Sequence, residues 1–308
     1  MNYTLHQLQV FVKIAKTASI TKAAEELNLS QPAVSIQLKN FQEQFDVPLT
    51  EIIGRKIYIT HFGKEIAIAG KKIIDEVNAI EYKTSLFKGK TTGKLKIAVV
   101  STGKYVMPYF LTDFLNQNQE IELLLDVTNR AKAIDALSRN ETDFSLVSVL
   151  PDKLNIEKEE LLQNKLYLVG NAEWAAKFKG KSKEVLTTIN LIYREEGSGV
   201  RLTLQQYLDN NNLKVKKKLE LTSNEAVKQA VIAGLGCSVM PLIGLKNELQ
   251  NGDLFIIPIK GFPIKTSWNL IWLKQKSLSP VALAFLNFIK SNKESIIKNH
   301  FEWYETYR

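Results

Sequence analysis

The segment 19–35 constrains the fold more than any other part of the chain, because it has the pattern of two short helices joined by a tight turn. Ser19 is placed to cap a helix over Thr21–Leu27, and a two-residue turn follows. Ser30 then caps a second helix, because a serine hydroxyl accepts a hydrogen bond from the free amides at a helix start. Pro32 falls in the first turn of that helix, where its missing N–H costs nothing.

The second predicted helix has two different faces. Apolar side chains recur at the spacing of a buried amphipathic stripe, namely Val34, Leu38, Phe41 and Phe45. Gln31, Ser35 and Lys39 share another face. In a helix-turn-helix the second helix enters the DNA major groove, where Gln pairs with adenine, Ser with bases or phosphates, and a proline ring touches a thymine methyl group. Two packed helices with a serine cap also occur in proteins that never touch DNA, so the pattern alone leaves both interpretations open.

A short β-hairpin is predicted next. Ile57–Thr60 alternates like a strand, and Gly54, Arg55 and Lys56 precede it. This pattern favours a wing whose tip offers two cations to phosphates or to the minor groove. The residues predicted to contact DNA are Thr21, Ser30, Gln31, Pro32, Ser35, Lys39, Arg55 and Lys56.

The composition permits nucleic-acid binding without establishing it. The formal net charge is +9, and a basic chain attracts polyanions, but Lys and Arg are not concentrated near the predicted helix-turn-helix. The single cysteine, Cys237, excludes an intramolecular disulfide, and the sequence has no signal peptide and no long uncharged apolar run. We therefore expect a soluble, cytoplasmic protein.

Residues 61–88 are predicted to form one long helix with a heptad seam. The seam positions are Ile66, Gly70, Ile73, Val77, Ile80, Thr84 and Phe87. Such a stripe must be buried, either on its own domain or on the same helix of a second subunit. We favour the dimer, because a glycine-containing linker at 88–94 follows, and a DNA-binding dimer with two-fold symmetry matches the two halves of a palindromic site.

After residue 94, short apolar runs alternate with helical stretches, which predicts an α/β sheet with right-handed crossovers. The strand-like runs are Leu95–Val100, Ile121–Val127, Phe144–Val149, Leu166–Val169, Leu191–Tyr193, Lys217–Leu221, Cys237–Met240, Leu254–Ile257 and Trp268–Leu273. Helical stretches are predicted at Tyr105–Leu115 and Lys132–Ser138.

Ligands of α/β sheets bind beyond the carboxyl ends of the strands, and this chain has polar residues at those ends. Hydroxyls after the first strand, at a helix N-terminus, suit an anion. The run 194–201 holds two glycines, a serine and two arginines, which suit a carboxylate or phosphate, although an ordinary glycine-rich helix start has the same pattern. The residues predicted to bind an effector are Ser101, Thr102, Asn129, Ser148, Arg194, Glu196, Ser198, Gly199, Arg201, Thr222 and Asn224.

An enzyme is a weaker alternative. His6, His61 and His300 are far apart in sequence, and Cys237 lies in an apolar run, which favours a core position over a nucleophile. Because the sequence has no metal-ligand spacing, phosphate loop or nucleophile elbow, we expect no catalytic residue, metal or cofactor. A cytoplasmic solute-binding protein without a regulatory DNA role is the other alternative; residues 1–60 weigh against it.

The N-terminal pattern resembles that of the LysR-type transcriptional regulators. The matching positions are Ala23-Ala24, Leu27, Ser30-Gln31-Pro32-Ala33-Val34-Ser35, Leu49, Arg55, Thr60 and Gly63. The resemblance implies a regulator of promoter DNA with an all-α winged helix-turn-helix at 1–61, a dimerisation helix at 62–89 and an effector-binding domain at 90–308. It also implies homodimers that pair into homotetramers.

The resemblance extends along the whole chain and implies a two-lobed α/β sensor domain like the periplasmic binding proteins of type 2. Lobe I would comprise 94–169 and 269–308, and lobe II 170–268. Several stretches look like the branch that controls carbon-fixation operons, namely 48–58, 194–201, 224–231, 261–264 and 278–280. That branch senses phosphorylated sugars or related metabolites, so the implied effector is a small anionic metabolite. Val200 stands where that branch has threonine.

Overall fold

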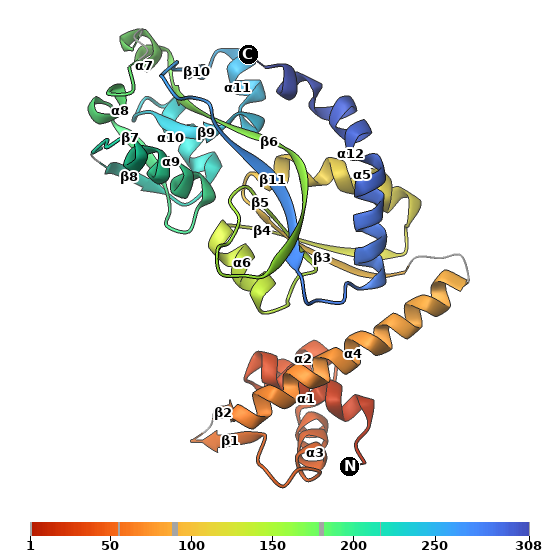
Figure 1. The fold of residues 1–308 in the computed structure, drawn as a ribbon. Coiled ribbons are helices and arrows are strands. Elements are labelled where there is room, and N and C mark those ends of the chain that lie inside the picture. Colours follow the sequence, from red (N-terminus) through yellow and green to blue (C-terminus); the bar gives the residue numbers. More distant parts are fainter. Residues whose placement is uncertain (1, 55, 88–91, 179–181, 216, 308) are drawn as a thin grey trace. The chain divides into compact units, whose positions relative to one another are not determined.

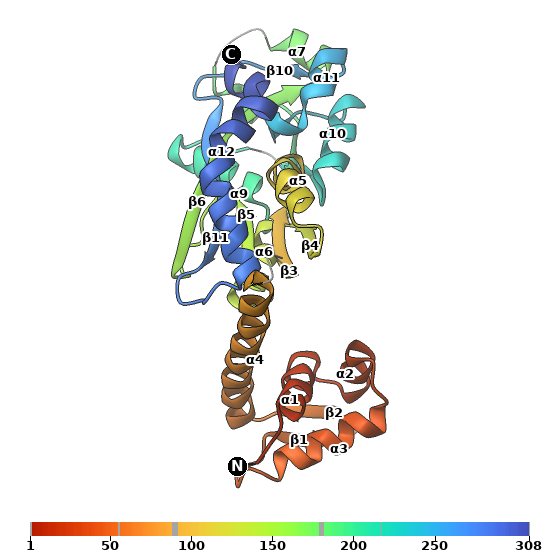
Figure 2. The same cartoon turned by 90° about the vertical axis from the view of Figure 1, so that its right-hand side faces the viewer.

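The computed structural model describes residues 2–54, 56–87, 92–178, 182–215 and 217–307. The chain divides into two compact units, Met1–Gly89 and Lys90–Arg308, called unit 1 and unit 2 below. Figures 1 and 2 show the helices and strands of each unit. Within the described ranges, no helix is both long and apolar enough to cross a membrane.

The described part of unit 1 contains four helices and a two-stranded hairpin. In chain order these are α1 (Leu5–Thr17), α2 (Ile20–Leu27), α3 (Gln31–Gln42), β1 (Thr50–Ile53), β2 (Lys56–Ile59) and α4 (His61–Phe87). Both predicted helix caps are confirmed. The hydroxyl of Ser19 accepts a hydrogen bond from the backbone N–H of Lys22, and the hydroxyl of Ser30 accepts one from Ala33, each at 3.3 Å. Asn28, with a φ of 53°, supplies the left-handed turn between α2 and α3.

Only one side of α3 packs against the core of unit 1. Val34 and Phe41 are fully buried and Leu38 is 8% exposed, and the ring of Phe41 lies 5.1 Å from that of Phe11 in α1. Phe45 lies beyond the end of α3 and is partly buried against the same cluster. The predicted stripe therefore attaches α3 to the unit, and the opposite face of this helix is left to solvent.

Gly63 allows α4 to begin directly against the hairpin. A β-carbon at this position would lie 2.1 Å from the carbonyl oxygen of Leu49. The hydroxyl of Thr60 accepts a hydrogen bond from the Gly63 amide (2.9 Å) and donates one to the carbonyl of Pro48 (2.7 Å). Leu49, Thr60 and Gly63 of the sequence pattern thus form one junction between the hairpin and α4.

The predicted seam of α4 has two different surroundings. Its first part is used within unit 1, because Ile66 packs on the core cluster and a β-carbon at Gly70 would come within 2.7 Å of a methyl carbon of Leu8. Farther along, Ile73 and Ile80 are 45% and 63% exposed. Packing on its own domain therefore accounts for the start of the seam, whereas Ile73 and Ile80 are exposed in the part of the chain that the structure describes.

Parts of this prediction lie outside the described residues. These are the side chains of Thr84 and Phe87 and the linker positions 88–91. The end of the predicted linker is wrong, since Gly93 and Lys94 already belong to the first strand of unit 2. The strand can begin there because its leading residues pair in parallel with the neighbouring strand, from Gly93 opposite Ile121 onward.

The described part of unit 2 contains a seven-stranded sheet and a two-stranded parallel sheet. The strands are β3 (Gly93–Val100), β4 (Ile121–Thr128), β5 (Phe144–Val147), β6 (Ile156–Gly170), β7 (Leu191–Arg194), β8 (Lys217–Leu221), β9 (Ser238–Pro241), β10 (Phe255–Ile256) and β11 (Ile264–Leu273). The order in the large sheet is β10-β6-β11-β5-β3-β4, with β9 also paired to β6. β3 is parallel to β4 and β5, and β7 is parallel to β8, whereas β6 pairs antiparallel with its three partners.

The sequence predicted only part of the two longest strands. β6 begins at Ile156, ten residues before the apolar run Leu166–Val169, and β11 begins before Trp268. The missed half of β6 is mostly polar and partly exposed, so it lacks the apolar run of a buried strand. It forms a ladder with β11 that starts at Ile156 opposite Leu273. These two strands run through both halves of unit 2 (Figure 1).

Helices cover the sheets of unit 2. They are η1 (Gly103–Tyr105), α5 (Met107–Gln117), α6 (Arg130–Ser138), α7 (Ala172–Lys177), α8 (Val185–Thr188), α9 (Gly199–Asn210), α10 (Asn224–Ile232), η2 (Leu242–Gly244), α11 (Lys246–Asn251) and α12 (Pro280–Thr306). We call the half with β3, β4, β5, α5, α6 and α12 lobe I, and the half with β7 to β10 and α7 to α11 lobe II. The aromatic residues near the end of α12 pack on unit 2: Phe301 and Tyr304 are buried, and Lys165 Nζ donates a hydrogen bond to the Tyr304 carbonyl (2.9 Å).

The junction at Gly63 makes a stability prediction. Gly63→Ala places a methyl group against a backbone carbonyl, so unit 1 should lose about 1–3 kcal/mol of unfolding free energy. All four tryptophans, Trp174, Trp268, Trp272 and Trp303, lie in unit 2. In urea, the circular-dichroism transition of the variant should therefore begin earlier while the tryptophan-fluorescence transition stays in place. Lys64→Ala, at the next and exposed position, is the control, and equal curves for the two variants would contradict the junction.

Candidate functional site

Most residues predicted to contact DNA lie on the surface of unit 1. Thr21, Ser30, Gln31, Pro32, Lys39 and Lys56 are exposed, Ser35 is half-buried, and Arg55 lies outside the described residues. The hydroxyl of Ser30 is already engaged as the cap of α3, so its contribution is to set the start of that helix. The N-terminal end and the outer face of α3 are open to a large partner.

Lys39 keeps its charge available on this face. Its Nζ lies 3.9 Å from Oε1 of Glu43, with both side chains mostly exposed, and such a pair contributes little to stability. Lys13, in contrast, is 2.8 Å from Glu26 and joins α1 to α2, and this hydrogen bond lowers the pKa of Glu26. The two lysines therefore differ in role although both are basic residues of the same unit.

The hairpin predicted as a wing is present, and much of its surface is apolar. β1 and β2 pair antiparallel from Thr50 opposite Ile59 to Ile53 opposite Lys56. Gly54 turns the chain with a φ of 64°. Ile52 and Ile53 are 72% and 62% exposed. Of the two cations predicted at the tip, the structure describes Lys56, which is exposed.

A narrow cleft, partly open to solvent, lies between the two lobes of unit 2. The residues that line it are Val100, Ser101, Thr102, Asn129, Arg130, Ser148, Arg194, Ser198, Gly199 and Val200. The first six lie at or just after the ends of β3, β4 and β5, and the other four lie at the end of β7 and the start of α9. The strand ends thus converge on one cleft, as the topology predicted.

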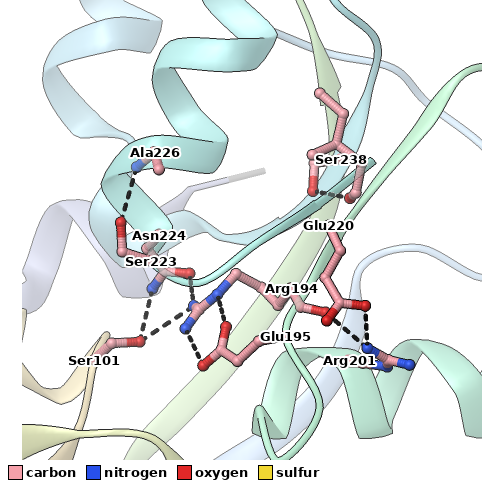
Figure 3. A network of polar contacts seen from close by, with 10 residues as sticks. Ser101, Arg194, Glu195, Arg201, Glu220, Ser223, Asn224, Ala226 and Ser238 are labelled. Carbon is pink, nitrogen blue, oxygen red and sulfur yellow. Dashed lines mark hydrogen bonds and ion pairs between the residues drawn. The ribbon is translucent and has the colours of Figure 1, made fainter. Parts of the chain in front are cut away.

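Arg194 is buried in the cleft wall and its donors are engaged (Figure 3). Its Nε and Nη2 donate to the two carboxylate oxygens of Glu195, at 2.8 and 3.0 Å. Its Nη1 donates to Ser101 Oγ at 3.2 Å and to Asn224 Oδ1. Glu195 therefore offsets the charge of Arg194, and the bond to Ser101 joins lobe II to lobe I.

Four of the predicted effector residues do not line this cleft. Arg201 lies two positions after Gly199 in α9, a rotation of roughly 200°, so its side chain points away from the cleft. It donates instead to Glu220 (2.8 Å) and to the Arg194 carbonyl (3.3 Å). Asn224 does not line the cleft itself but bonds to two residues that do: its Oδ1 accepts from Arg194, and its Nδ2 donates to Ser101 Oγ at 3.5 Å. Glu196 and Thr222 are exposed to solvent.

Three hydroxyl groups of the cleft wall have no hydrogen-bond partner among the residues that the structure describes: those of Thr102, Ser148 and Ser198. Ser198 precedes α9 without capping it, so the first amides of this helix also lack a side-chain acceptor. Asn129 is different, since its Oδ1 caps α6 by accepting from the Lys132 amide (3.0 Å). The free donors of both lobes thus face the same small space.

Arg130 is a cation of the cleft wall that the sequence prediction omitted. Its Nε and Nη2 donate to the carbonyls of Val149 and Leu150, both at 2.8 Å, and no carboxylate forms an ion pair with it within the described ranges. Burial lowers the pKa of this guanidinium, and Asp152 opposes that effect. Its position directly after Asn129, at the end of β4, was the signal that could have identified it.

The described residues do not bring catalytic groups together. Cys237 is fully buried in the core of lobe II, and burial raises the pKa of its thiol to about 12. Among the residues searched, no cluster of His, Cys, Asp and Glu could hold a metal ion. The side chains at the cleft are hydrogen-bond donors and cations, which can bind a ligand.

Comparison with known proteins gives matches over both units. Residues 5–64 match the sequence model of the bacterial regulatory helix-turn-helix protein, lysR family, and residues 88–294 match that of the LysR substrate binding domain. The chain is 38% identical to the HTH-type transcriptional activator CmpR of Synechocystis sp., over 96% of this chain and 97% of that protein. It is 35% identical to a RuBisCO operon transcriptional regulator of Allochromatium vinosum, over 94% and 97%.

A solved structure resembles unit 2. The regulatory domain of Synechocystis CcmR in complex with 2-PG superposes with a TM-score of 0.63 at 33% sequence identity. It covers 66% of this chain and 98% of that domain. The similarity in sequence and fold concerns the unit that contains the cleft described above.

The buried thiol makes a chemical prediction. With a pKa near 12 instead of the ordinary 9.0, about one Cys237 in ten thousand is a thiolate at pH 8. A thiol reagent such as DTNB should therefore leave the native protein unlabelled at pH 8 and react with one equivalent after unfolding in guanidinium. Rapid reaction of the native protein would contradict the core position and reopen an enzymatic interpretation.

Proposed function

Because this chain belongs to the LysR family of transcriptional regulators, which are not enzymes, we propose that it binds a specific promoter sequence as a homo-oligomer under the control of a small anionic metabolite held in the cleft of unit 2. The observation that carries the metabolite proposal is the set of unpartnered hydroxyls that face one another across this cleft. A regulator of transcription acts on the genome, so we place it inside the cell.

The donor set supports an anion as the ligand. The hydroxyls of Thr102, Ser148 and Ser198 can donate to ligand oxygens, and the N-terminal end of α9 adds amides with a favourable dipole. Arg130 adds a positive charge that forms no direct ion pair with a carboxylate among the described residues. A neutral ligand would leave this charge and part of the donors unpaired, and burial makes such groups costly.

The relatives narrow the choice of compounds. CmpR and the RuBisCO operon regulators lie in the carbon-fixation branch, and the CcmR regulatory domain was solved with 2-PG. We propose that this chain senses 2-PG or a related metabolite. Val200 lines the cleft and contributes no hydrogen bond from its side chain, so the ligand contacts here fall to the neighbouring hydroxyls.

We propose that α4 forms the dimer contact, with residues 62–89 as the dimerisation helix between the DNA-binding domain at 1–61 and the effector domain at 90–308. Ile73 and Ile80 support this assignment, because both are large, apolar and exposed along one helix. A two-fold dimer would present two copies of α3 to the halves of a palindromic site, and two dimers would form a tetramer.

The DNA part of this proposal is tested with the region upstream of the protein's own gene. In a gel-shift assay the wild type should prefer this fragment over random DNA by about 10³-fold or more at moderate salt. Ser35→Arg should abolish the preference, because a longer side chain replaces the groove-facing hydroxyl. Gln44→Arg adds the same charge at an exposed position beyond the end of α3 and should preserve it. No preference by the wild type would overturn specific DNA binding.

The cleft is tested by thermal shift with 2-PG and a panel of sugar phosphates. A ligand at 100 times its dissociation constant stabilises the folded state by about 2.7 kcal/mol, which raises the melting temperature of the wild type. Thr102→Val keeps the side-chain volume and removes the hydroxyl, so affinity should fall about tenfold or more. Thr112→Val, at an exposed threonine of α5, should behave as wild type. Equal affinities for all three proteins would show that the ligand binds elsewhere.

A further inference from the structure

The outer face of α3 has an apolar centre. Ile36, a large apolar residue, is 57% exposed. The other residues on this side of α3 are partly apolar and partly polar. With about 100° of rotation per residue, Ile36 points almost directly away from the buried side chains of Val34, Leu38 and Phe41. Its exposure therefore follows from the way the core holds the helix.

The neighbours of Ile36 make this face chemically mixed. Pro32 lies one turn before it and Asn40 one turn after it, and both are exposed. Lys39 lies along the edge of the same face. Polar side chains on this face can donate to base edges and phosphates, whereas Ile36 and Pro32 offer only apolar surface.

An apolar side chain in the major groove has one specific partner among the bases. Thymine alone carries a methyl group there, whereas the other features of the four base pairs are hydrogen-bond donors and acceptors. We propose that Ile36, supported by the ring of Pro32, reads the 5-methyl group of a thymine in each half of the operator. This inference rests on the proposed sequence-specific DNA binding by α3.

The test removes the methyl group from the DNA. Duplexes are first selected by the wild-type protein from a random library, and each thymine of the selected site is then replaced, one at a time, by deoxyuridine. Base pairing and the groove hydrogen-bond pattern are unchanged by this replacement. The wild type should lose about fourfold in affinity at one thymine per half-site, which corresponds to the loss of one buried methyl group.

Two isoleucine variants distinguish a groove contact from a general loss of affinity. Ile36→Ala should lose less than twofold at the thymine where the wild type loses fourfold, because the side chain that contacts the methyl group is missing. Ile68→Ala is the matched control, since Ile68 is 56% exposed on α4, and it should keep the wild-type deoxyuridine profile even where its overall affinity changes.

The outcomes separate this inference from the proposed function. Failure of the wild type to enrich any sequence would overturn specific DNA binding and the inference with it. Enrichment of a site without a methyl-sensitive thymine, or a deoxyuridine profile of Ile36→Ala equal to that of the wild type, would overturn the role of Ile36 alone.

Discussion

A guanidinium group buried between two lobes must be paired, because an unpaired buried charge is among the most costly defects a fold can carry. Arg194 meets this requirement with groups from three segments: the carboxylate of Glu195 beside it, the amide of Asn224 at the start of α10, and the hydroxyl of Ser101 from lobe I. The shape of the cleft follows from this pairing. The end of β7, the start of α10 and the end of β3 have to lie together for the charge of Arg194 to be satisfied.

The same pairing decides where a ligand charge can go. Two arginines of the run 194–201 looked available from the sequence, yet each is held by a carboxylate, Arg194 by Glu195 and Arg201 by Glu220. Arg130, with two backbone carbonyls as acceptors, is the cleft cation whose charge a ligand can still offset. Sequence order could not distinguish these arginines, because the assignment depends on side-chain directions and on residues far along the chain.

Local rules in the sequence predicted unit 1 well. The caps at Ser19 and Ser30 depend on one hydroxyl and the amides three residues later, and the stripe of α3 depends on helical spacing, so both could be read without tertiary information. Gly63 belonged to the family pattern, but the sequence does not show why glycine is needed there. The reason is the close approach of the Leu49 carbonyl, which only the three-dimensional junction reveals. In unit 2 the polar half of β6 was missed, because an exposed antiparallel ladder carries no apolar run.

Contacts across the cleft also limit how a ligand can act. The amide of Ala131 in lobe I donates to the carbonyl of Gly197 in lobe II (3.1 Å), and a β-carbon at Gly197 would come within 2.9 Å of the Ala131 side chain. With a φ of 87°, Gly197 is the residue that permits this approach. A ligand shifts an equilibrium only by its difference in affinity for the two states. An anion that needs donors from both lobes at once binds only where the lobes are this close, so its binding free energy favours that arrangement over any more open one.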